Sequence, residues 1–113
     1  MEIEIEIYET SSGKRPFVIW FEDLNEIHTR AKILTRLDRL KLGNFGDCKS
    51  IDEGVSELRI HYGPGFRIYY SKVGNKIILL LCGGDKGSQV KDIKKAKEYL
   101  RDYRSREKKD GKK

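Results

Sequence analysis

The 113-residue sequence has no long hydrophobic run and little cysteine, proline or histidine. No stretch approaches the roughly 20 apolar residues that a membrane-spanning helix needs. The first residues alternate Glu and Ile, which is unlike the basic and apolar start of a signal peptide. The two cysteines, Cys48 and Cys82, lack metal-ligand spacing and a CxxC partner. These absences predict a cytoplasmic protein with free thiols, no bound metal and no cofactor.

Charge, by contrast, is abundant, since 37% of the residues are charged and 37% are hydrophobic. A chain of this length predicts one domain with a small core. The net charge of +6 comes entirely from residues 94–113, which hold 10 Lys or Arg and 4 Asp or Glu. This positive end favours polyanionic partners, although a solvated helix face with a disordered tail explains it equally well. We expect a folded domain over 1–103 and a basic, mobile tail over 104–113.

Hydrophobic periodicity predicts the order strand, helix, helix, strand, strand, strand, helix. The expected strands cover 2–8, 57–62, 66–70 and 77–82, and the expected helices cover 16–24, 27–42 and 90–103. The short link between the first two helices predicts a helical hairpin, and the segment 44–54 is expected to be loop. The fold class is therefore α+β, with a twisted antiparallel sheet, an N-terminal helical hairpin and a C-terminal helix.

A hairpin of alternating polar and apolar residues lies at the centre of this pattern. Its polar face carries Arg59 and His61 on the first arm and Arg67 and Tyr69 on the second. A three-residue loop over 63–65 keeps the apolar faces together, and this register places His61 opposite Arg67 and Arg59 opposite Tyr69. Such a patch suits a phosphodiester, because arginine binds its oxygens bidentately and His or Tyr can move a proton.

Each of these residues also has a simpler interpretation. Arg67 can pair with Glu57 across the sheet, which is worth only ~0–1 kcal/mol at a surface. His61 can be an exposed strand residue, and Tyr69 can be either an ordinary strand residue or a platform on which a base stacks. Two arginines on one face exceed what pairing needs, so we favour a functional patch.

Three segments carry a family resemblance: 42–47 (LGNFGD), 57–70 (ELRIHYGPGFRIYY) and 79–86 (LLLCGGDK). With the element order, they resemble the RelE/ParE toxin superfamily, and most of all its HigB-like, phage-derived branch of addiction module killer proteins. The resemblance covers about residues 15–103. It implies a type II toxin, silenced by a cognate antitoxin such as a helix-turn-helix protein, that enters the ribosome and cleaves mRNA. The implied chemistry is attack of the ribose 2′-OH on the adjacent phosphate, without a metal.

The resemblance also implies roles for individual residues. Arg67 matches the phosphate-binding arginine of the family, and Arg59 and Lys86 match two further basic positions. Several family members place a Tyr or His just after the last strand, but residues 83–89 contain neither. The general acid is therefore open, and the remaining candidates are His61, Tyr69 and Tyr99.

Basic residues outside the hairpin are expected to contact RNA or the ribosome by non-specific electrostatics. They are Lys49 in the expected loop and Lys94, Lys95, Arg101 and Arg104 near the C-terminus. Two other functions stay open. The ParE branch shares the fold but inhibits DNA gyrase, and an inactive relative would bind only RNA or an antitoxin.

Overall fold

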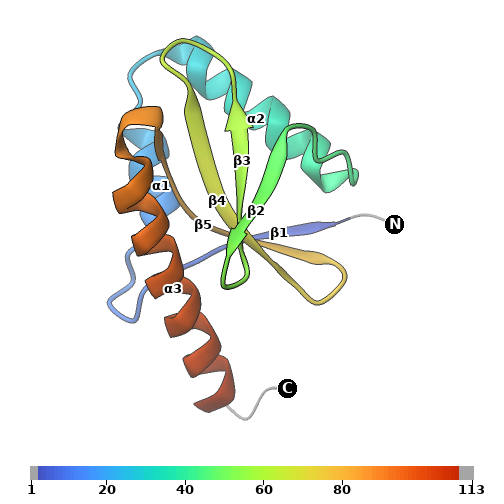
Figure 1. The fold of residues 1–113 in the computed structure, drawn as a ribbon, viewed down its shortest axis with the longest axis vertical. Helices are drawn as coiled ribbons and strands as arrows, with labels where there is room; N and C mark the ends of the chain where they lie inside the picture. Colours follow the sequence, from blue (N-terminus) through green and yellow to red (C-terminus); the bar gives the residue numbers. More distant parts are fainter. Residues whose placement is uncertain (1–2, 110–113) are drawn as a thin grey trace.

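The computed structural model describes residues 3–109 of the chain, which form a mixed sheet with helices on both faces (Figure 1). The strands are β1 (Glu4–Ile7), β2 (Cys48–Asp52), β3 (Val55–Ile60), β4 (Phe66–Val73) and β5 (Ile77–Asp85). The helices are α1 (Pro16–Glu22), α2 (Ile27–Lys41) and α3 (Gln89–Lys109), with a short 3-10 helix η1 (Lys86–Ser88) before α3. No helix within the described range is both long and apolar enough to cross a membrane.

The observed sheet corrects the predicted fold class. The strand order is β1-β5-β4-β3-β2, and β1 pairs in parallel with β5 while the other neighbours are antiparallel. The sheet is therefore mixed and not wholly antiparallel. Alternating Glu and Ile residues place β1 on the sheet, but this pattern holds equally for either strand direction. The broad class, helices packed against a sheet, is as predicted.

The second correction is β2, a strand within the segment that was expected to be loop. The element order is therefore strand, helix, helix, four strands, helix. This strand forms one edge of the sheet, and four of its five residues are exposed, so it shows no apolar alternation. A two-residue turn joins it to β3, with positive φ at both Glu53 (51°) and Gly54 (87°). Positive φ at both central residues is the geometry of a type I′ hairpin turn, for which Glu53 is an unusual residue.

Two apolar clusters cover the two faces of the sheet. On one face, Leu58 and Ile68 pack with Phe17 of α1 and Ile33 of α2. On the other face, Tyr69 and neighbouring strand residues share a cluster with Ala96 and Leu100 of α3. Because the alternation along β3 and β4 assigns residues to these faces, the predicted apolar face of the hairpin is confirmed.

The helices α1 and α2 cover one face together, but they do not form the compact hairpin that we expected. An apolar groove separates them, with side chains of β1 and β5 among its lining, including Ile7 and Leu80. They contact near their adjacent ends, where Arg30 Nη2 donates to the carbonyl oxygen of Glu22 at 2.7 Å. Each helix packs on the sheet in preference to the other, since the sheet offers the larger apolar surface.

The helix α3 continues beyond the predicted domain boundary at residue 103 to Lys109. Arg106, in the predicted tail, donates to Asp102 and to the backbone carbonyl of Glu9. The remaining residues of that predicted tail, 110–113, lie outside the described range. Residues 104–109 are thus helical, and Arg106 joins them to the segment that follows β1.

Two glycines near the end of β5 let helices on both faces approach the strand closely. A Cβ atom on Gly83 would lie 2.3 Å from the ring of Trp20 in α1, and one on Gly84 would lie 1.8 Å from Oδ2 of Asp92 in α3. Neither position has room for a side chain. Gly84 pairs with Arg67 in the sheet, so this close packing fixes the start of α3 beside the polar face of the hairpin.

Candidate functional site

The arginines of the hairpin form a cross-strand pair. Arg59 of β3 lies directly opposite Arg67 of β4, so both side chains are on the same face of the sheet. Five residues, 61–65, separate the last paired positions instead of the predicted three. The predicted partners of Arg59 and Arg67 are therefore wrong by two positions. A shift of two leaves every side chain on its face, which is why the predicted convergence of the two arginines is confirmed.

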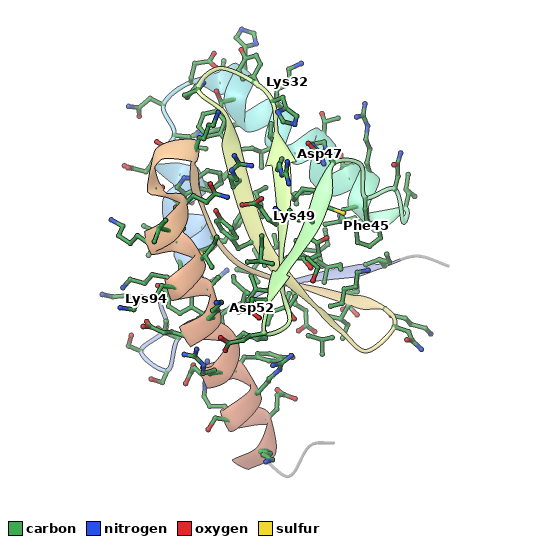
Figure 2. The ribbon with its side chains drawn as sticks, viewed as in Figure 1. Lys32, Phe45, Asp47, Lys49, Asp52 and Lys94 are labelled. Carbon is green, nitrogen blue, oxygen red and sulfur yellow. The ribbon has the colours of Figure 1, made fainter. Side chains whose placement is uncertain are left out.

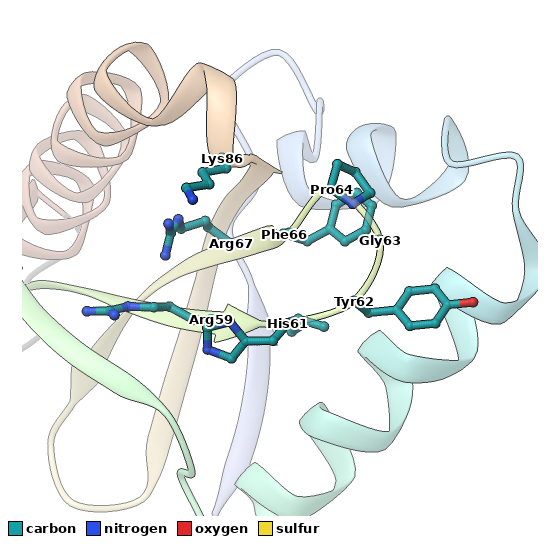
Figure 3. A pocket seen from close by; sticks show the side chains of 10 residues that line it. Arg59, His61, Tyr62, Gly63, Pro64, Phe66, Arg67 and Lys86 are labelled. Carbon is teal, nitrogen blue, oxygen red and sulfur yellow. The ribbon is translucent and has the colours of Figure 1, made fainter.

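An open pocket of about 520 Å³ lies at this end of the sheet (Figure 3). Arg59, His61 and Arg67 line it together with the turn of the hairpin and Lys86 of η1. The backbone N–H of Lys86 donates to the carbonyl oxygen of Gly65 at 3.2 Å, which holds η1 against the hairpin. The structure therefore brings together four of the five predicted catalytic residues.

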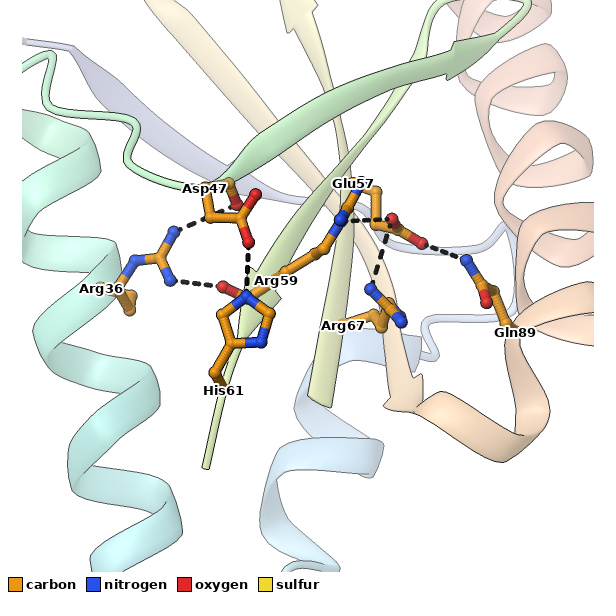
Figure 4. A network of polar contacts seen from close by, with 7 residues as sticks. All are labelled: Arg36, Asp47, Glu57, Arg59, His61, Arg67 and Gln89. Atoms are coloured by element: carbon orange, nitrogen blue, oxygen red, sulfur yellow. Dashed lines mark hydrogen bonds and ion pairs between the residues drawn. The ribbon is translucent and has the colours of Figure 1, made fainter. Parts of the chain in front are cut away.

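A buried carboxylate holds the two arginines in place (Figure 4). Oε1 of Glu57 lies 3.3 Å from Arg59 Nε and 3.6 Å from Arg67 Nη1. Gln89, at the start of α3, donates from Nε2 to Oε2 of Glu57 at 2.8 Å. Glu57 is only 1% exposed, whereas the side chains of Arg59 and Arg67 are 29% and 14% exposed. The expected alternative pairing of Arg67 with Glu57 therefore exists, and Glu57 serves both arginines at once.

One carboxylate does not neutralise this group of cations. Within the described residues no ion pair forms at Lys86, and the buried Nε of Arg67 has no hydrogen-bond partner. This Nε is buried within the fold, where an unpaired donor costs about 1–3 kcal/mol, and it is not exposed to the pocket. The pocket thus carries an excess of positive charge, which suits an anionic ligand.

His61 is held at the edge of the pocket by Asp47, which precedes β2. Nε2 of His61 lies 2.5 Å from Oδ2 of Asp47, and this contact holds the pKa of the Asp47 carboxyl below its usual range. The imidazole remains 72% exposed, so it is oriented without being covered. An exposed imidazole oriented by a carboxylate is a common arrangement for proton transfer.

Arg36 of α2 holds the backbone of the segments that carry Arg59 and Asp47. Its guanidinium donates to the backbone carbonyl oxygens of Arg59, Phe45 and Asp47, the last two at 3.1 and 3.4 Å. Burial lowers the pKa of Arg36, and the nearby charge of Asp47 opposes this effect. Arg36 thereby ties α2 to the end of β3 and to the loop that carries Asp47.

Tyr69 does not take the role expected of it. Its side chain is fully buried beneath α3, so no face of the ring is open for a base to stack on. Burial, reinforced by the charge of Glu57, raises the pKa of the Tyr69 hydroxyl, which has no hydrogen-bond partner in the described chain. Tyr69 lies opposite Glu57 in the sheet, so its side chain is on the same face as the two arginines. Tyr99 stacks on Tyr8, with ring centroids 5.0 Å apart, and does not line the pocket.

The basic residues expected to bind RNA do not line the pocket. Two of them, Lys49 and Lys94, are labelled in Figure 2. Lys49 is exposed on the edge strand β2, where it pairs with Glu57 in the sheet and so shares the face of the arginines. Lys94 points away from the sheet on α3. Arg101 is paired with Glu53 at 3.0 Å. The remaining two, Lys95 and Arg104, are also exposed on α3.

Sequence reasoning missed three supporting residues: Asp47, Arg36 and Gln89. Each acts on a residue far away in the sequence, from a loop or a helix whose position no local pattern specifies. Only Asp47 had a local signal, because it ends the segment LGNFGD that carries part of the family resemblance.

Comparison with known proteins gives one informative match. No protein-family model matches the chain. An uncharacterized protein of Haemophilus influenzae is 48% identical over 81 residues, which cover 72% of this chain and 82% of the relative. The resemblance to the RelE/ParE superfamily stays a prediction, because the relative has no described activity.

Proposed function

The chain belongs to the same family as this Haemophilus influenzae protein, and we propose that it is an endoribonuclease toxin that cleaves translated mRNA. The observation that carries the proposal is the pair of Arg59 and Arg67 at an open pocket, with Glu57 as the one carboxylate bound to both. A phosphodiester would supply a further negative charge, and its oxygens accept hydrogen bonds from guanidinium groups in a bidentate geometry.

The reaction that fits this pocket is an internal displacement at phosphorus. The ribose 2′-OH attacks the adjacent phosphate, so the bond from O2′ to phosphorus forms while the bond to the 5′-oxygen of the next nucleotide breaks. One proton leaves the 2′-OH, and one proton is delivered to the departing 5′-oxygen. The products are a 2′,3′-cyclic phosphate and a free 5′-OH.

The pocket residues divide this work by their chemistry. Arg59, Arg67 and Lys86 would bind the phosphate and stabilise the charge that grows on its oxygens, with each charge-assisted bond worth about 1.5–3 kcal/mol. His61, oriented by Asp47, would carry one of the two proton transfers. Glu57 is buried and touches both arginines, so it acts as a positioning residue that holds the guanidiniums in one geometry.

The proposal also covers where the protein acts and what keeps it inactive. It would work in the cytoplasm on the ribosome and would be silenced by a cognate antitoxin. The basic face of α3, with Lys94 and Lys95 exposed, suits contact with ribosomal RNA.

The test is controlled expression in bacteria, read out as growth and as new 5′ ends on translated messages by primer extension. The wild-type chain should arrest growth and produce these ends. Arg67→Ala should lower the cleavage rate about 100-fold or more, in line with the loss of one charge-stabilising donor. Arg15→Ala is the matched control, because Arg15 is exposed and pairs only with the exposed Glu9, at 3.4 Å.

Two results would overturn the proposal. The first is a wild-type chain, shown to be folded, that neither arrests growth nor cuts messages. The second is cleavage that persists unchanged in Arg67→Ala. Growth arrest with a DNA-damage response and intact messages would instead support inhibition of gyrase.

A further inference from the structure

A second pocket, of about 540 Å³, lies on the other side of the segment that carries His61 and Tyr62. This segment lines both pockets, so the two are neighbours across one stretch of chain. The opposite wall of the second pocket comes from α2, which contributes Lys32, Arg36 and Arg39. In Figure 3, Tyr62 points toward α2, away from Arg67 and Lys86.

The wall formed by α2 is strongly basic. The helix holds five Lys or Arg residues and one acidic residue, Asp38, which lines the separate groove between α1 and α2. Among residues 3–109, no Asp or Glu lines the second pocket. Lys32 and Arg39 are exposed and form no ion pair within the described chain, and only the cation at Arg36 is occupied, by backbone carbonyls. Unpaired cations on one helix face repel each other and so destabilise the fold. Binding of an anionic partner therefore explains their arrangement better than a role in stability does.

Tyr62 adds an aromatic surface to this basic wall. Its ring is only partly buried against the core, and Nζ of Lys32 lies 5.3 Å from the ring centroid. Proteins bind single-stranded RNA by combining a basic groove for the backbone with aromatic rings on which bases stack. The second pocket holds both kinds of group, with Tyr62 on one side and the basic residues of α2 on the other.

We propose that the pocket between α2 and Tyr62 is a second nucleotide subsite, which binds the RNA next to the linkage held by Arg59 and Arg67. Lys32 and Arg39 bind a neighbouring phosphate, and Tyr62 stacks on a base. The position of the cut relative to this subsite rests on the proposed nuclease function. The binding of single-stranded RNA by the subsite does not depend on cleavage.

The experiment measures binding of fluorescent 2′-O-methyl RNA by anisotropy. The methyl group blocks the attacking oxygen, so the probe is bound but not cut. A dinucleotide fills only the arginine pocket, and a hexanucleotide reaches both pockets. The double variant Lys32→Ala/Arg39→Ala should weaken hexanucleotide binding about tenfold or more and leave dinucleotide binding unchanged. Its slope of log affinity against log salt should fall by about 1.4, which corresponds to two phosphate contacts on a single strand.

Two controls separate a built subsite from a general basic surface. Lys14→Ala/Lys76→Ala removes the same charge from two exposed positions outside both pockets and should change hexanucleotide affinity less than about twofold. Tyr62→Leu should weaken the hexanucleotide about tenfold but leave an abasic hexamer unaffected, because only the former offers bases to stack. Tyr62→Phe keeps the ring and should bind as the wild type does, and unchanged binding of the abasic hexamer by Tyr62→Leu shows that the leucine variant is folded.

The outcomes distinguish failure of the subsite from failure of the nuclease. The subsite would be overturned if Lys32→Ala/Arg39→Ala and Lys14→Ala/Lys76→Ala lost the same hexanucleotide affinity, or if neither lost any. Specific loss in Lys32→Ala/Arg39→Ala, with no cleavage by the wild-type chain in cells, would keep the RNA-binding subsite and reject the nuclease. If the wild-type chain cleaves messages in cells but Lys32→Ala/Arg39→Ala binds the hexanucleotide normally, the nuclease stands and the subsite is rejected.

Discussion

Two clusters in this molecule combine arginine, a carboxylate and tyrosine, but they differ in how fully their polar groups are paired. In the first, the α3 cluster, Asp102 accepts from the Tyr8 hydroxyl at 2.6 Å and from Arg106 Nη2 at 2.8 Å. Arg106 also donates to the backbone of Glu9. Every group in this cluster has a protein partner, and the cluster fastens α3 to the segment after β1.

The second, the pocket cluster, consists of Glu57, Arg59 and Arg67, with Tyr69 beneath them. Here two cations share one carboxylate, and both Arg67 Nε and the Tyr69 hydroxyl lack hydrogen-bond partners in the described chain. The comparison shows that the same residue types give a structural cluster when donors and acceptors balance. In the pocket cluster the cations outnumber the carboxylate, so the partly exposed guanidiniums leave capacity for an anionic ligand.

The largest expected effect comes from removing the carboxylate of the pocket cluster. Glu57→Leu should lower the free energy of unfolding by about 3 kcal/mol, because two partly buried guanidiniums lose their counter-charge. Asp102→Asn should cost about 1 kcal/mol or less, since the Asp102 side chain is 42% exposed. Urea denaturation of both variants measures the difference, and equal losses would contradict the distinction between the clusters.

The next effect is the response of each cluster to an anion. Inorganic phosphate should stabilise the wild-type protein by about 1.4 kcal/mol at ten times its dissociation constant, because it binds the folded pocket and not the unfolded chain. Arg67→Ala should abolish this shift in thermal unfolding. Arg106→Ala should lower the starting stability but keep the shift. If both variants keep it, phosphate does not bind at the pocket cluster.

The smallest effect is a pH dependence of the α3 cluster. Burial and the hydrogen bond to Asp102 raise the pKa of Tyr8 from 10.0 to about 12. Because the folded-state pKa is raised, this stabilisation is complete below pH 10 and is lost as the pH rises toward 12. Tyr8→Phe should therefore be less stable than wild type at pH 9, with a difference that shrinks by pH 12. A constant difference in urea denaturation across this range would contradict the assigned pKa.

The sequence predicted the elements that bury an apolar face and missed the one that does not. Alternation along 57–70 assigned residues to the two faces of the hairpin, and all helices were found near their predicted positions. The edge strand β2 was not predicted because an exposed strand needs no alternation of apolar residues. The predicted register was wrong by two because alternation specifies only whether positions pair even with even, and the turn decides the rest.

Which features of the candidate site the sequence could predict depends on how far apart along the chain the residues lie. The shared face of Arg59 and Arg67 follows from local alternation, so the sequence could predict it. The burial of Tyr69 could not be predicted, because it results from the placement of α3 over this part of the sheet. The bond from Gln89 to Glu57 likewise joins residues 32 positions apart.

What the sequence by itself determined is therefore periodicity: which residues form strands and helices, and which side chains of the hairpin share a face. Period-two alternation is a local property of the backbone, and it holds wherever a strand lies in the fold. The tertiary structure alone decided which cations are paired, which tyrosine is buried, and that β1 runs parallel to β5. Those outcomes depend on long-range packing, in which α3 meets the sheet closely at Gly84 and leaves the hairpin end open.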